Sequence, residues 1–391
     1  MNPTIVVTGG GSGGHITPIM AVAAELKRQQ PEARIIYIGQ VGDGLADIPE
    51  QDPNIDEVFY VRAGKFRRYH GEGFKQLLDL KTVFLNIRDL FYIAIGLVQS
   101  FRLLRKLRPG VIFTRGGYVS VPVALGGKLQ GIPYITHDSD STPSLANRLI
   151  ARWASLHAVA LPEELYPYPP KKTVMVGVPV SSLYQVVTPT AQHRFKHELG
   201  LDQAKQILLV TGGGNGARQL NNAVINNAQY LLRRYPHLFI VHIAGRSLEN
   251  EVNEGYERAV EESYRERISI EGFISNLHAF SGAADVVIAR GGATNLAEFA
   301  IQGKACVIVP SKQLIWNVKN TEALVERHAV VQLTEDQAEQ ERRLASVLSD
   351  LFDNESKRLH LAQQLSDLAR PDAAKHLAML LLEQLPRTKK D

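Results

Sequence analysis

The stretch Thr8-Gly9-Gly10-Gly11-Ser12-Gly13-Gly14-His15 lies between two apolar segments near the start of the chain. A short apolar run ends at Val7, and apolar residues then recur with helical spacing from Ile16 to Gln30, so the order strand, glycine loop, helix is predicted. Glycines let the backbone of such a turn approach a ligand closely, and the amides at a helix start carry partial positive charge. The stretch therefore predicts an anion site.

The same opening occurs twice, because Val-Thr-Gly-Gly-Gly begins at Val7 and again at Val210. A chain of 391 residues also exceeds the roughly 250–300 residues that one core usually holds. Together these features predict two similar α/β domains, with a ligand held where their loops face each other. We place a first domain at residues 1–180, a second at 190–370 and a C-terminal helix at 371–391.

Strand-like runs alternate with segments of helical spacing in both halves, which predicts parallel sheets covered by helices on both faces. After Glu335 the chain is expected to be helical to about Leu385. The expected strands are Ile5–Val7, Arg34–Ile38, Val58–Val61, Val111–Phe113, Tyr134–Thr136 and His157–Ala160, then Ile207–Val210, Phe239–Ile243, Ile268–Ile270, Val286–Ala289, Ala305–Val309 and Val330–Leu333.

The composition is that of an ordinary soluble globular protein, with 45% hydrophobic and 21% charged residues. Cys306 is the single cysteine, which excludes a disulfide framework and a cysteine-based zinc site. The first apolar run enters the glycine loop directly, so we expect no signal peptide and a cytoplasmic protein.

Positive charge is concentrated in residues 60–110, which hold eleven Lys/Arg against three acidic residues, whereas the whole chain has a net charge of +4. Within this stretch, Phe74–Leu107 has apolar residues at a 3,4 spacing, and we expect two helices separated near Thr82 or Asn86. Either these helices pack on the core, or their apolar face enters a bilayer while basic residues meet anionic headgroups. The run Leu90–Val98 is about half the roughly 20 residues that span a membrane.

The pattern Gly9-x-Gly11-x-x-Gly14 formally matches the dinucleotide-binding fingerprint. That fingerprint also requires an acidic residue after the second strand, where this chain has Gln40. Neither glycine loop contains Gly-Lys-Ser/Thr, which excludes a P-loop nucleotidase. A nicotinamide cofactor is therefore not expected.

Three polar loops of the first half follow predicted parallel strands and should meet at one edge of the sheet. His15 could accept a proton near neutral pH, or it could simply begin a helix. Gly116–Pro122 and His137–Asp140 follow the next two strands along that edge. The spacing Asp138-x-Asp140 is too common to indicate a metal, so we favour hydrogen bonding or a general base.

The segment Ala289–Glu298 of the second half again runs from strand to helix through a glycine turn. Asn295 and Glu298 have the spacing of a capping box, which would make Glu298 a helix cap. Alternatively, the amides of Gly291–Ala293 bind phosphate and the Glu298 carboxylate binds a vicinal diol such as ribose.

Taken together, these motifs resemble the MurG family, which transfers N-acetylglucosamine from UDP-GlcNAc to the undecaprenyl-linked precursor lipid I during peptidoglycan synthesis. The motifs stand in the family's order over nearly the whole chain: Gly10–His15, Gly116–Ser120, Gly212–Arg218 and Gly292–Glu298. The resemblance implies the GT-B fold, in which two Rossmann-like domains with parallel sheets face each other across a cleft. It places the donor nucleotide on the second domain, the acceptor on the first, and a last helix, about Ala373 to Gln384, back on the first domain.

The resemblance also implies roles for individual residues, and no metal or other cofactor. Glu298 would hold the ribose, Ile274 would bind uracil through its backbone, and Asn317 would contact the sugar. The implied catalytic residues are His15, Asp138, Asp140 and Tyr118. Donor binding is implied for Ser12, Gly13, Gly14, Gly213, Gly214, Asn215, Gly216, Ile274, Gly292, Ala293, Thr294, Glu298 and Asn317, and acceptor contacts for Ser120 and Asn147.

The chain departs from the family pattern at three places. His137-Asp138-Ser139-Asp140 stands where the family has His-Glu-Gln-Asn, Gly177–Ser181 lacks the usual arginine, and Trp316–Thr321 replaces a sugar-binding His-Gln or Gln-Gln motif. The expected activity is inverting transfer to lipid I on the cytoplasmic side of the membrane, with an anionic membrane surface bound through residues 60–110 and no nucleic-acid partner. The alternatives are an epimerase or glycolipid synthase of the same fold, or a UDP-sugar-binding protein with a degenerate site.

Overall fold

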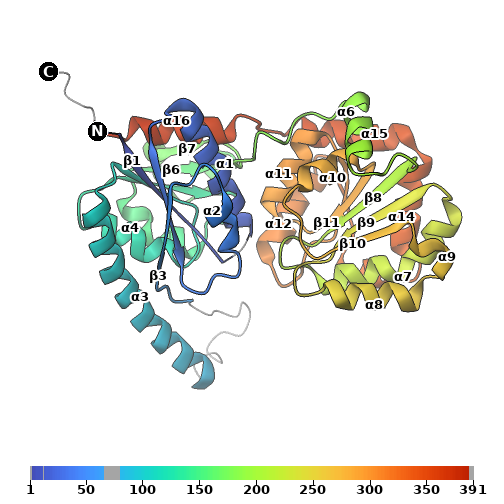
Figure 1. The fold of residues 1–391 in the computed structure, drawn as a ribbon, viewed down its shortest axis with the longest axis horizontal. Helices are drawn as coiled ribbons and strands as arrows, with labels where there is room; N and C mark the ends of the chain where they lie inside the picture. The colour runs from blue at the N-terminus through green and yellow to red at the C-terminus, as the bar shows by residue number, and fades with distance from the viewer. Residues whose placement is uncertain (1, 12, 66–79, 387–391) are drawn as a thin grey trace. The chain divides into compact units, whose positions relative to one another are not determined.

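The computed structural model describes residues 2–11, 13–65 and 80–386. The chain divides into two compact units, one formed by Met1–Ser181 with Asp372–Asp391 and the other by Ser182–Pro371. Each unit contains one parallel sheet (Figure 1). The strand order is β3-β2-β1-β4-β5-β6-β7 in the first and β10-β9-β8-β11-β12-β13 in the second. The predicted α/β class with two parallel sheets is confirmed.

Alternation along β1 shows how the first sheet is covered on both faces. Ile5 and Val7 belong to a buried cluster with α1 and α16, whereas Val6 belongs to a cluster with α3 and α4. Successive strand side chains point to opposite faces, so a continuous apolar run is buried on both sides. The elements are β1 (Thr4–Thr8), α1 (Gly13–Gln29), β2 (Arg34–Gln40), α2 (Asp47–Gln51), β3 (Glu57–Val61), α3 (Leu80–Leu107), β4 (Val111–Thr114), α4 (Ser120–Lys128), β5 (Tyr134–Asp138), α5 (Leu145–Ile150), β6 (Leu156–Val159), β7 (Thr173–Met175) and α16 (Ala373–Glu383).

Helix α3 is continuous from Leu80 to Leu107, so the predicted break near Thr82 or Asn86 is wrong. An asparagine cap contributes only about 1 kcal/mol, which does not outweigh an uninterrupted ladder of helical hydrogen bonds. The helix packs against α4, and a Cβ at Gly96 would lie 1.9 Å from the Arg62 carbonyl oxygen. This close approach requires glycine. The predicted helical residues 74–79 lie outside the described part of the chain.

The opposite face of α3 is apolar and exposed, and Figure 1 shows the N-terminal turns of the helix extending past the sheet of the first unit. Its exposed side chains include Phe84 (68%), Ile87 (53%), Phe91 (66%) and Val98 (50%). Our alternative of a face packed on the core is therefore wrong for these residues. By length and composition, Phe84–Leu107 is also apolar enough to cross a membrane, which the shorter run Leu90–Val98 did not predict.

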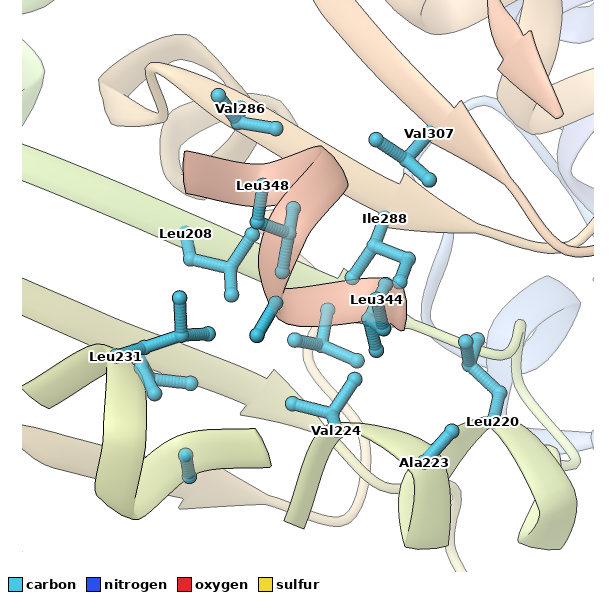
Figure 2. Packing of buried hydrophobic residues seen from close by; sticks show 14 of the residues in the cluster. Leu208, Leu220, Ala223, Val224, Leu231, Val286, Ile288, Val307, Leu344 and Leu348 are labelled. Carbon is cyan, nitrogen blue, oxygen red and sulfur yellow. The ribbon is translucent and has the colours of Figure 1, made fainter. Parts of the chain in front are cut away.

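The second unit has the same layered construction. Leu208 and Val210 of its central strand face α7 and α14, and Ile207 and Leu209 face the cluster that includes α11. Figure 2 shows side chains of α7, α14 and the sheet pointing toward one another in the first of these clusters. The elements are α6 (Pro189–Glu198), β8 (Gln206–Thr211), α7 (Arg218–Arg234), β9 (Leu238–Ile243), α8 (Glu249–Ala259), α9 (Glu262–Arg265), β10 (Ile268–Glu271), α10 (Leu277–Ala283), β11 (Val286–Ala289), α11 (Ala293–Gln302), β12 (Ala305–Ile308), α12 (Ile315–Val325), β13 (Val331–Gln332), α13 (Glu335–Glu339), α14 (Arg343–Asp353) and α15 (Glu355–Ser366).

The last helix, α16, packs in the first unit. Leu377, Ala378 and Leu381 are fully buried in the same cluster as Ile5 and Ile16, and α16 contacts α1. The chain thus returns to the first unit after completing the second.

Candidate active site

The polar loops of the first unit begin side by side because their strands are neighbours. In the sheet register, Thr8 of β1 lies opposite Thr114 of β4, and Thr114 lies opposite Thr136 of β5. Gly117 has a φ of 82°, and a Cβ there would lie 2.8 Å from the Gly10 carbonyl oxygen. A glycine is required at this contact, which joins the first glycine loop to the turn before α4.

His15 lies in the first turn of α1 and is neutral at pH 7. Burial and the Arg115 guanidinium lower its pKa to about 4, while a hydrogen bond to the Gly10 backbone raises it. In a neutral imidazole one ring nitrogen donates and the other accepts, so donation to the Gly10 carbonyl fixes the tautomer. The imidazole is then in the form that can accept a proton.

Arg115 is a buried cation that our sequence interpretation missed. Its guanidinium donates to the Ser139 hydroxyl. Burial lowers the pKa of Arg115, and the nearby carboxylates of Asp140 and Asp138 oppose that shift. The sequence signal is an arginine placed directly after a buried strand and before two glycines.

The Asp138 carboxylate is buried and is held by three donors of its own unit. Its Oδ1 accepts the Ser144 amide at 3.1 Å and the Asn147 Nδ2 at 2.9 Å, and its Oδ2 accepts the Tyr168 hydroxyl at 2.7 Å. Burial raises the pKa of Asp138, and these hydrogen bonds oppose the shift. Asp138 therefore fixes the β5 loop to α5, and three of the roughly four acceptor positions of its carboxylate are occupied by donors of the chain itself.

The two residues expected on the acceptor side, Ser120 and Asn147, are fully buried. The Ser120 hydroxyl donates to the Gly116 carbonyl at 2.6 Å, and Asn147 Nδ2 donates to the His137 carbonyl at 2.9 Å. These side chains support the two loops from within. Tyr118 is partly buried, with its ring edge 3.7 Å from the position of a Cβ on Gly11.

The first glycine loop is partly occupied by a carboxylate of the chain itself. Asp43, in the loop after β2, accepts the Gly11 amide at 2.8 Å through Oδ2 and the Leu45 amide at 3.1 Å through Oδ1. A Cβ on Gly10 would lie 2.7 Å from that Oδ2, so glycine is needed there for the contact. The predicted anion site therefore holds an internal anion at Gly11. The Ser12 prediction lies outside the described residues, and Gly13 and Gly14 form the start of α1.

The loops expected to bind the donor also begin side by side, in the second unit. Thr211 of β8 lies opposite Ala289 of β11, so the loop Gly212–Gly216 and the turn Arg290–Thr294 start at the same sheet edge. Gly213 and Gly216 have φ values of 81° and 73°, which favour glycine. Within these loops, Asn215 is exposed.

Helix α11 begins at Ala293, directly after the glycine turn, with Gly292 as its N-cap. A Cβ at Gly292 would meet no heavy atom within 4 Å, so the approach to this backbone is open, whereas the Thr294 side chain is buried. Backbone amides at the start of a helix bind anions, so the backbone at Gly292 is a candidate anion site.

Glu298 is the sixth residue of α11, so the capping-box alternative is wrong: the helix starts too early for Asn295 to be its cap. The side chain is only 7% exposed, and its carboxyl group accepts the Tyr184 hydroxyl. Burial raises the pKa of Glu298 to about 8, and the bond from Tyr184 opposes that shift. A buried carboxyl with a single neutral donor is suited to polar ligand groups such as sugar hydroxyls.

A second basic residue, Arg246, lies beside the second glycine loop and was also missed. Its guanidinium stacks over the Phe273 ring, 4.2 Å from the centroid, and the Phe273 ring edge lies 3.7 Å from the position of a Cβ on Gly214. Ile274 follows and is partly buried against the core. Arg246 thus supplies a cation near this loop. The segment Gly177–Ser181, where the family has an arginine, contains no basic residue.

Asn317 lies in the first turns of α12 with its side chain buried. The backbone carbonyl oxygen of Asn317 lies 2.5 Å from the position of a Cβ on Gly291. The Asn320 Nδ2 donates to the Gly291 carbonyl at 3.3 Å. Asn317 therefore packs α12 against the glycine turn, and the adjacent Trp316 is exposed. Within residues 2–11, 13–65 and 80–386, no group of three or more His, Cys, Asp or Glu side chains could hold a metal ion.

Comparison with known proteins places this geometry in a family. Residues 5–159 match the glycosyltransferase family 28 N-terminal domain, and residues 207–377 match the family 28 C-terminal domain. A protein of Bacillus cytotoxicus is 30% identical over 378 residues, covering 95% of this chain and 97% of its own length. One of Natranaerobius thermophilus is 29% identical over 380 residues, covering 96% and 98%. Both are named UDP-N-acetylglucosamine–N-acetylmuramyl-(pentapeptide) pyrophosphoryl-undecaprenol N-acetylglucosamine transferase.

Among solved structures, Acinetobacter baumannii MurG is similar with a TM-score of 0.68 at 21% identity, covering 97% of this chain and 99% of that one. UDP-GlcNAc 2-epimerase of Neisseria meningitidis, bound to UDP-GlcNAc, gives a TM-score of 0.67 at 12% identity, covering 98% and 100%. These likenesses confirm the predicted GT-B fold. With both family 28 domains matched in order, and relatives at about 30% identity over nearly the full length, the chain belongs to the MurG family of glycosyltransferase family 28.

Proposed function

We propose that this glycosyltransferase moves N-acetylglucosamine from UDP-GlcNAc to undecaprenyl-pyrophosphoryl-MurNAc-pentapeptide, lipid I, to form lipid II. The observation that carries the proposal is the division of site chemistry between the two units. An open helix N-terminus and a buried carboxyl lie on α11 in the second unit, and a neutral histidine lies at a glycine loop in the first. The relatives that match nearly the whole chain carry the name of this reaction.

The donor is assigned to the second unit. Its diphosphate binds the amides of the Gly213–Gly216 loop and of the turn at Gly292, Ala293 and Thr294, with Arg246 as an additional cation. Its ribose hydroxyls bind Glu298, and its uracil contacts the backbone at Ile274 beside Phe273. Asn317 contributes to donor binding indirectly, because it packs against the glycine turn at Gly291 and fixes the position of that turn.

His15 is assigned as the general base. It accepts the proton of the acceptor hydroxyl as that oxygen attacks the anomeric carbon and UDP departs, which inverts the configuration. His15 is preferred to Asp138 because the Asp138 carboxylate already accepts three hydrogen bonds. Charge that develops on the leaving diphosphate is stabilised by backbone amides that are already oriented, so we propose that no protein-bound metal is required.

The assay that tests this function measures sugar transfer to lipid I from UDP-GlcNAc, UDP-GalNAc and UDP-glucose, with and without EDTA. We expect transfer of GlcNAc to dominate and to persist in EDTA. Preferred transfer of another sugar, or conversion of UDP-GlcNAc into an epimer, would contradict the assigned reaction. Binding of UDP without turnover would indicate a binding protein. Activity lost in EDTA and restored by manganese would contradict the metal-free mechanism alone.

We further propose that the enzyme acts as a peripheral protein on the cytoplasmic side of the membrane, held by the exposed face of α3. Phe84, Ile87 and Phe91 present apolar side chains there. The guanidinium carbons of Arg62 and Arg88 lie 5.2 and 5.4 Å from the centroid of the Tyr92 ring. Arg88 and Tyr92 belong to α3, and Arg62 directly follows β3. Apolar insertion combined with basic contacts to anionic lipid suits an interfacial helix. The buried contacts of α3 with α4 favour this arrangement over a spanning helix.

Replacing both Phe84 and Phe91 with serine should weaken binding to vesicles that contain anionic lipid by more than tenfold, because each phenylalanine is worth roughly 1.5–3 kcal/mol when buried. Sedimentation with phosphatidylglycerol vesicles at low and high salt provides the measurement, and binding should also weaken with salt. Leu359→Ser, at an exposed leucine of the second unit, is the matched control. Equal binding by wild type and the double variant would contradict the proposal that the exposed face of α3 binds the membrane.

A further inference from the structure

Tyr184 lies at the start of the second unit, a few residues before α6. Its hydroxyl donates to the carboxyl group of Glu298 on α11. Three residues later, the Val187 amide donates to the Gln302 carbonyl at 3.4 Å, near the end of the same helix. Residues 184–187 are thus attached to α11 at two positions one helical turn apart.

The Tyr184 ring is also fixed from the side. It meets the His278 ring of α10 edge to face, with centroids 6.0 Å apart and an interplanar angle of 71°. His278 in turn meets the Phe195 ring of α6 at 6.3 Å. Packing of the ring limits where the Tyr184 hydroxyl can point, so its bond to Glu298 is preorganised.

A hydroxyl in this position affects what Glu298 can bind. A carboxylate offers about four lone-pair positions, and Tyr184 fills one of them. A glutamate side chain without that bond would be free to change rotamer, and fixing it costs conformational free energy when a ligand binds. A carboxylate already held in one rotamer binds a diol without that cost.

We propose that Tyr184 is a positioning residue for the donor's ribose, which it serves by holding the Glu298 carboxylate in the orientation that accepts the 2′- and 3′-hydroxyls. The inference rests on the proposed function, in which Glu298 binds the ribose. It makes Tyr184 a determinant of selectivity for ribonucleotides, because a buried acceptor placed for the 2′-hydroxyl is left unpaired by a 2′-deoxyribose.

The test compares UDP with 2′-deoxy-UDP by calorimetry on the full chain at pH 9, where the Glu298 carboxyl, whose pKa is about 8, is ionised. In wild type, UDP should bind roughly 10- to 100-fold more tightly than 2′-deoxy-UDP, the range for a hydrogen bond to a charged group. Tyr184→Phe keeps the ring but removes the hydroxyl, so it should weaken UDP binding about tenfold and 2′-deoxy-UDP binding much less. The ratio of the two affinities should therefore fall toward one.

Two controls separate this role from general packing. Tyr230→Phe changes a half-exposed tyrosine about 18 Å along α7 from the helix start, by the rise of 1.5 Å per residue, and should leave both affinities unchanged. In a Glu298→Gln background, Tyr184→Phe should have less than a twofold effect on UDP, because the two residues act as one unit.

An unchanged preference for UDP in Tyr184→Phe, whether or not both affinities fall, would overturn the inference while leaving the proposed function intact. A further tenfold loss in the Glu298→Gln background would also overturn it. Failure of the wild type to bind UDP at all would instead overturn the proposed function, and the inference with it.

Discussion

Glu298→Gln is expected to weaken UDP binding at pH 9 by roughly 10- to 100-fold, because the Glu298 carboxyl, whose pKa is about 8, is ionised there and its hydrogen bonds with the ligand are lost. Glutamine keeps the size of the side chain, but it offers a neutral oxygen and a donor where two hydroxyls need acceptors. Transfer should fall mainly through the apparent affinity for UDP-GlcNAc. Glu326→Gln, at an exposed glutamate after α12, is the matched control. UDP affinity equal to that of the control would contradict the ribose assignment.

The same substitution should make the ligand-free protein more stable at alkaline pH. The pKa of Glu298 is about 8 in the folded state and 4.5 ordinarily, so between these values the folded state keeps a proton that the unfolded state has lost. The free energy of unfolding therefore falls as pH rises through this window, by about 1.4 kcal/mol for each unit. Glutamine removes this loss.

Urea unfolding at pH 5 and pH 8 measures the difference. From pH 5 to pH 8, the wild type should lose roughly 2–4 kcal/mol more stability than Glu298→Gln, with other titrating groups common to both proteins. Parallel pH dependence in the two proteins would show that the Glu298 carboxyl titrates in the folded state as it does in the unfolded one.

His15→Ala should reduce kcat by roughly 10²- to 10⁴-fold, the usual contribution of a positioned general base. Affinity for UDP should hardly change, because the donor is assigned to the second unit. His360→Ala, at an exposed histidine of α15, is the control. A kcat for His15→Ala within threefold of the control would exclude the base assignment.

The pH profile gives a second test of His15. Its pKa is lowered to about 4, mainly by burial, so the imidazole remains neutral well below the ordinary histidine pKa of 6.5. Wild-type activity should therefore decline only as pH falls toward 4, and the acid limb should disappear in His15→Ala. A decline centred near pH 6.5 would mean that the base lies in a more solvated place.

Central strands such as β4, β8 and β11 could be predicted because their side chains are buried on both faces, which leaves continuous apolar runs in the sequence. Strand β7 (Thr173–Met175) was missed because it is a three-residue edge strand without such a run. The prediction of a break in α3 was wrong because it relied on local capping residues. The continuous buried face of the helix was the stronger signal.

The two copies of Val-Thr-Gly-Gly-Gly lead into loops with different backbone structures, although their residues are identical. After Thr8 the helix begins at Gly13, whereas after Thr211 it begins at Arg218. Positive φ occurs at Gly11 in the first loop but at Gly213 and Gly216 in the second. Neighbouring loops impose this difference, since Gly216 packs against Gly245 and Gly11 bonds to Asp43.

The residues that sequence reasoning missed share one property. Asp43, Arg115, Arg246 and Tyr184 lie outside every motif and reach the site from loops whose proximity is created by the sheet register or by packing. Their partners, respectively Gly11, Ser139, Phe273 and Glu298, are 24 to 114 positions away in the chain. No pattern within a short window contains such pairs.

Asp43 affects which of the two copies of the Val-Thr-Gly-Gly-Gly motif can bind a diphosphate. Two like charges about 4 Å apart repel by about 4 kcal/mol near a protein surface, so a diphosphate is discouraged from the Gly11 amide that the carboxylate already bonds. We propose that this repulsion directs the nucleotide to the second copy, where the Gly213 amide donates to the Thr211 hydroxyl and not to a carboxylate. On this proposal, a single aspartate 32 positions from the amide that it bonds lets the same short sequence serve two purposes: ligand binding in the second half of the chain and support of a loop in the first.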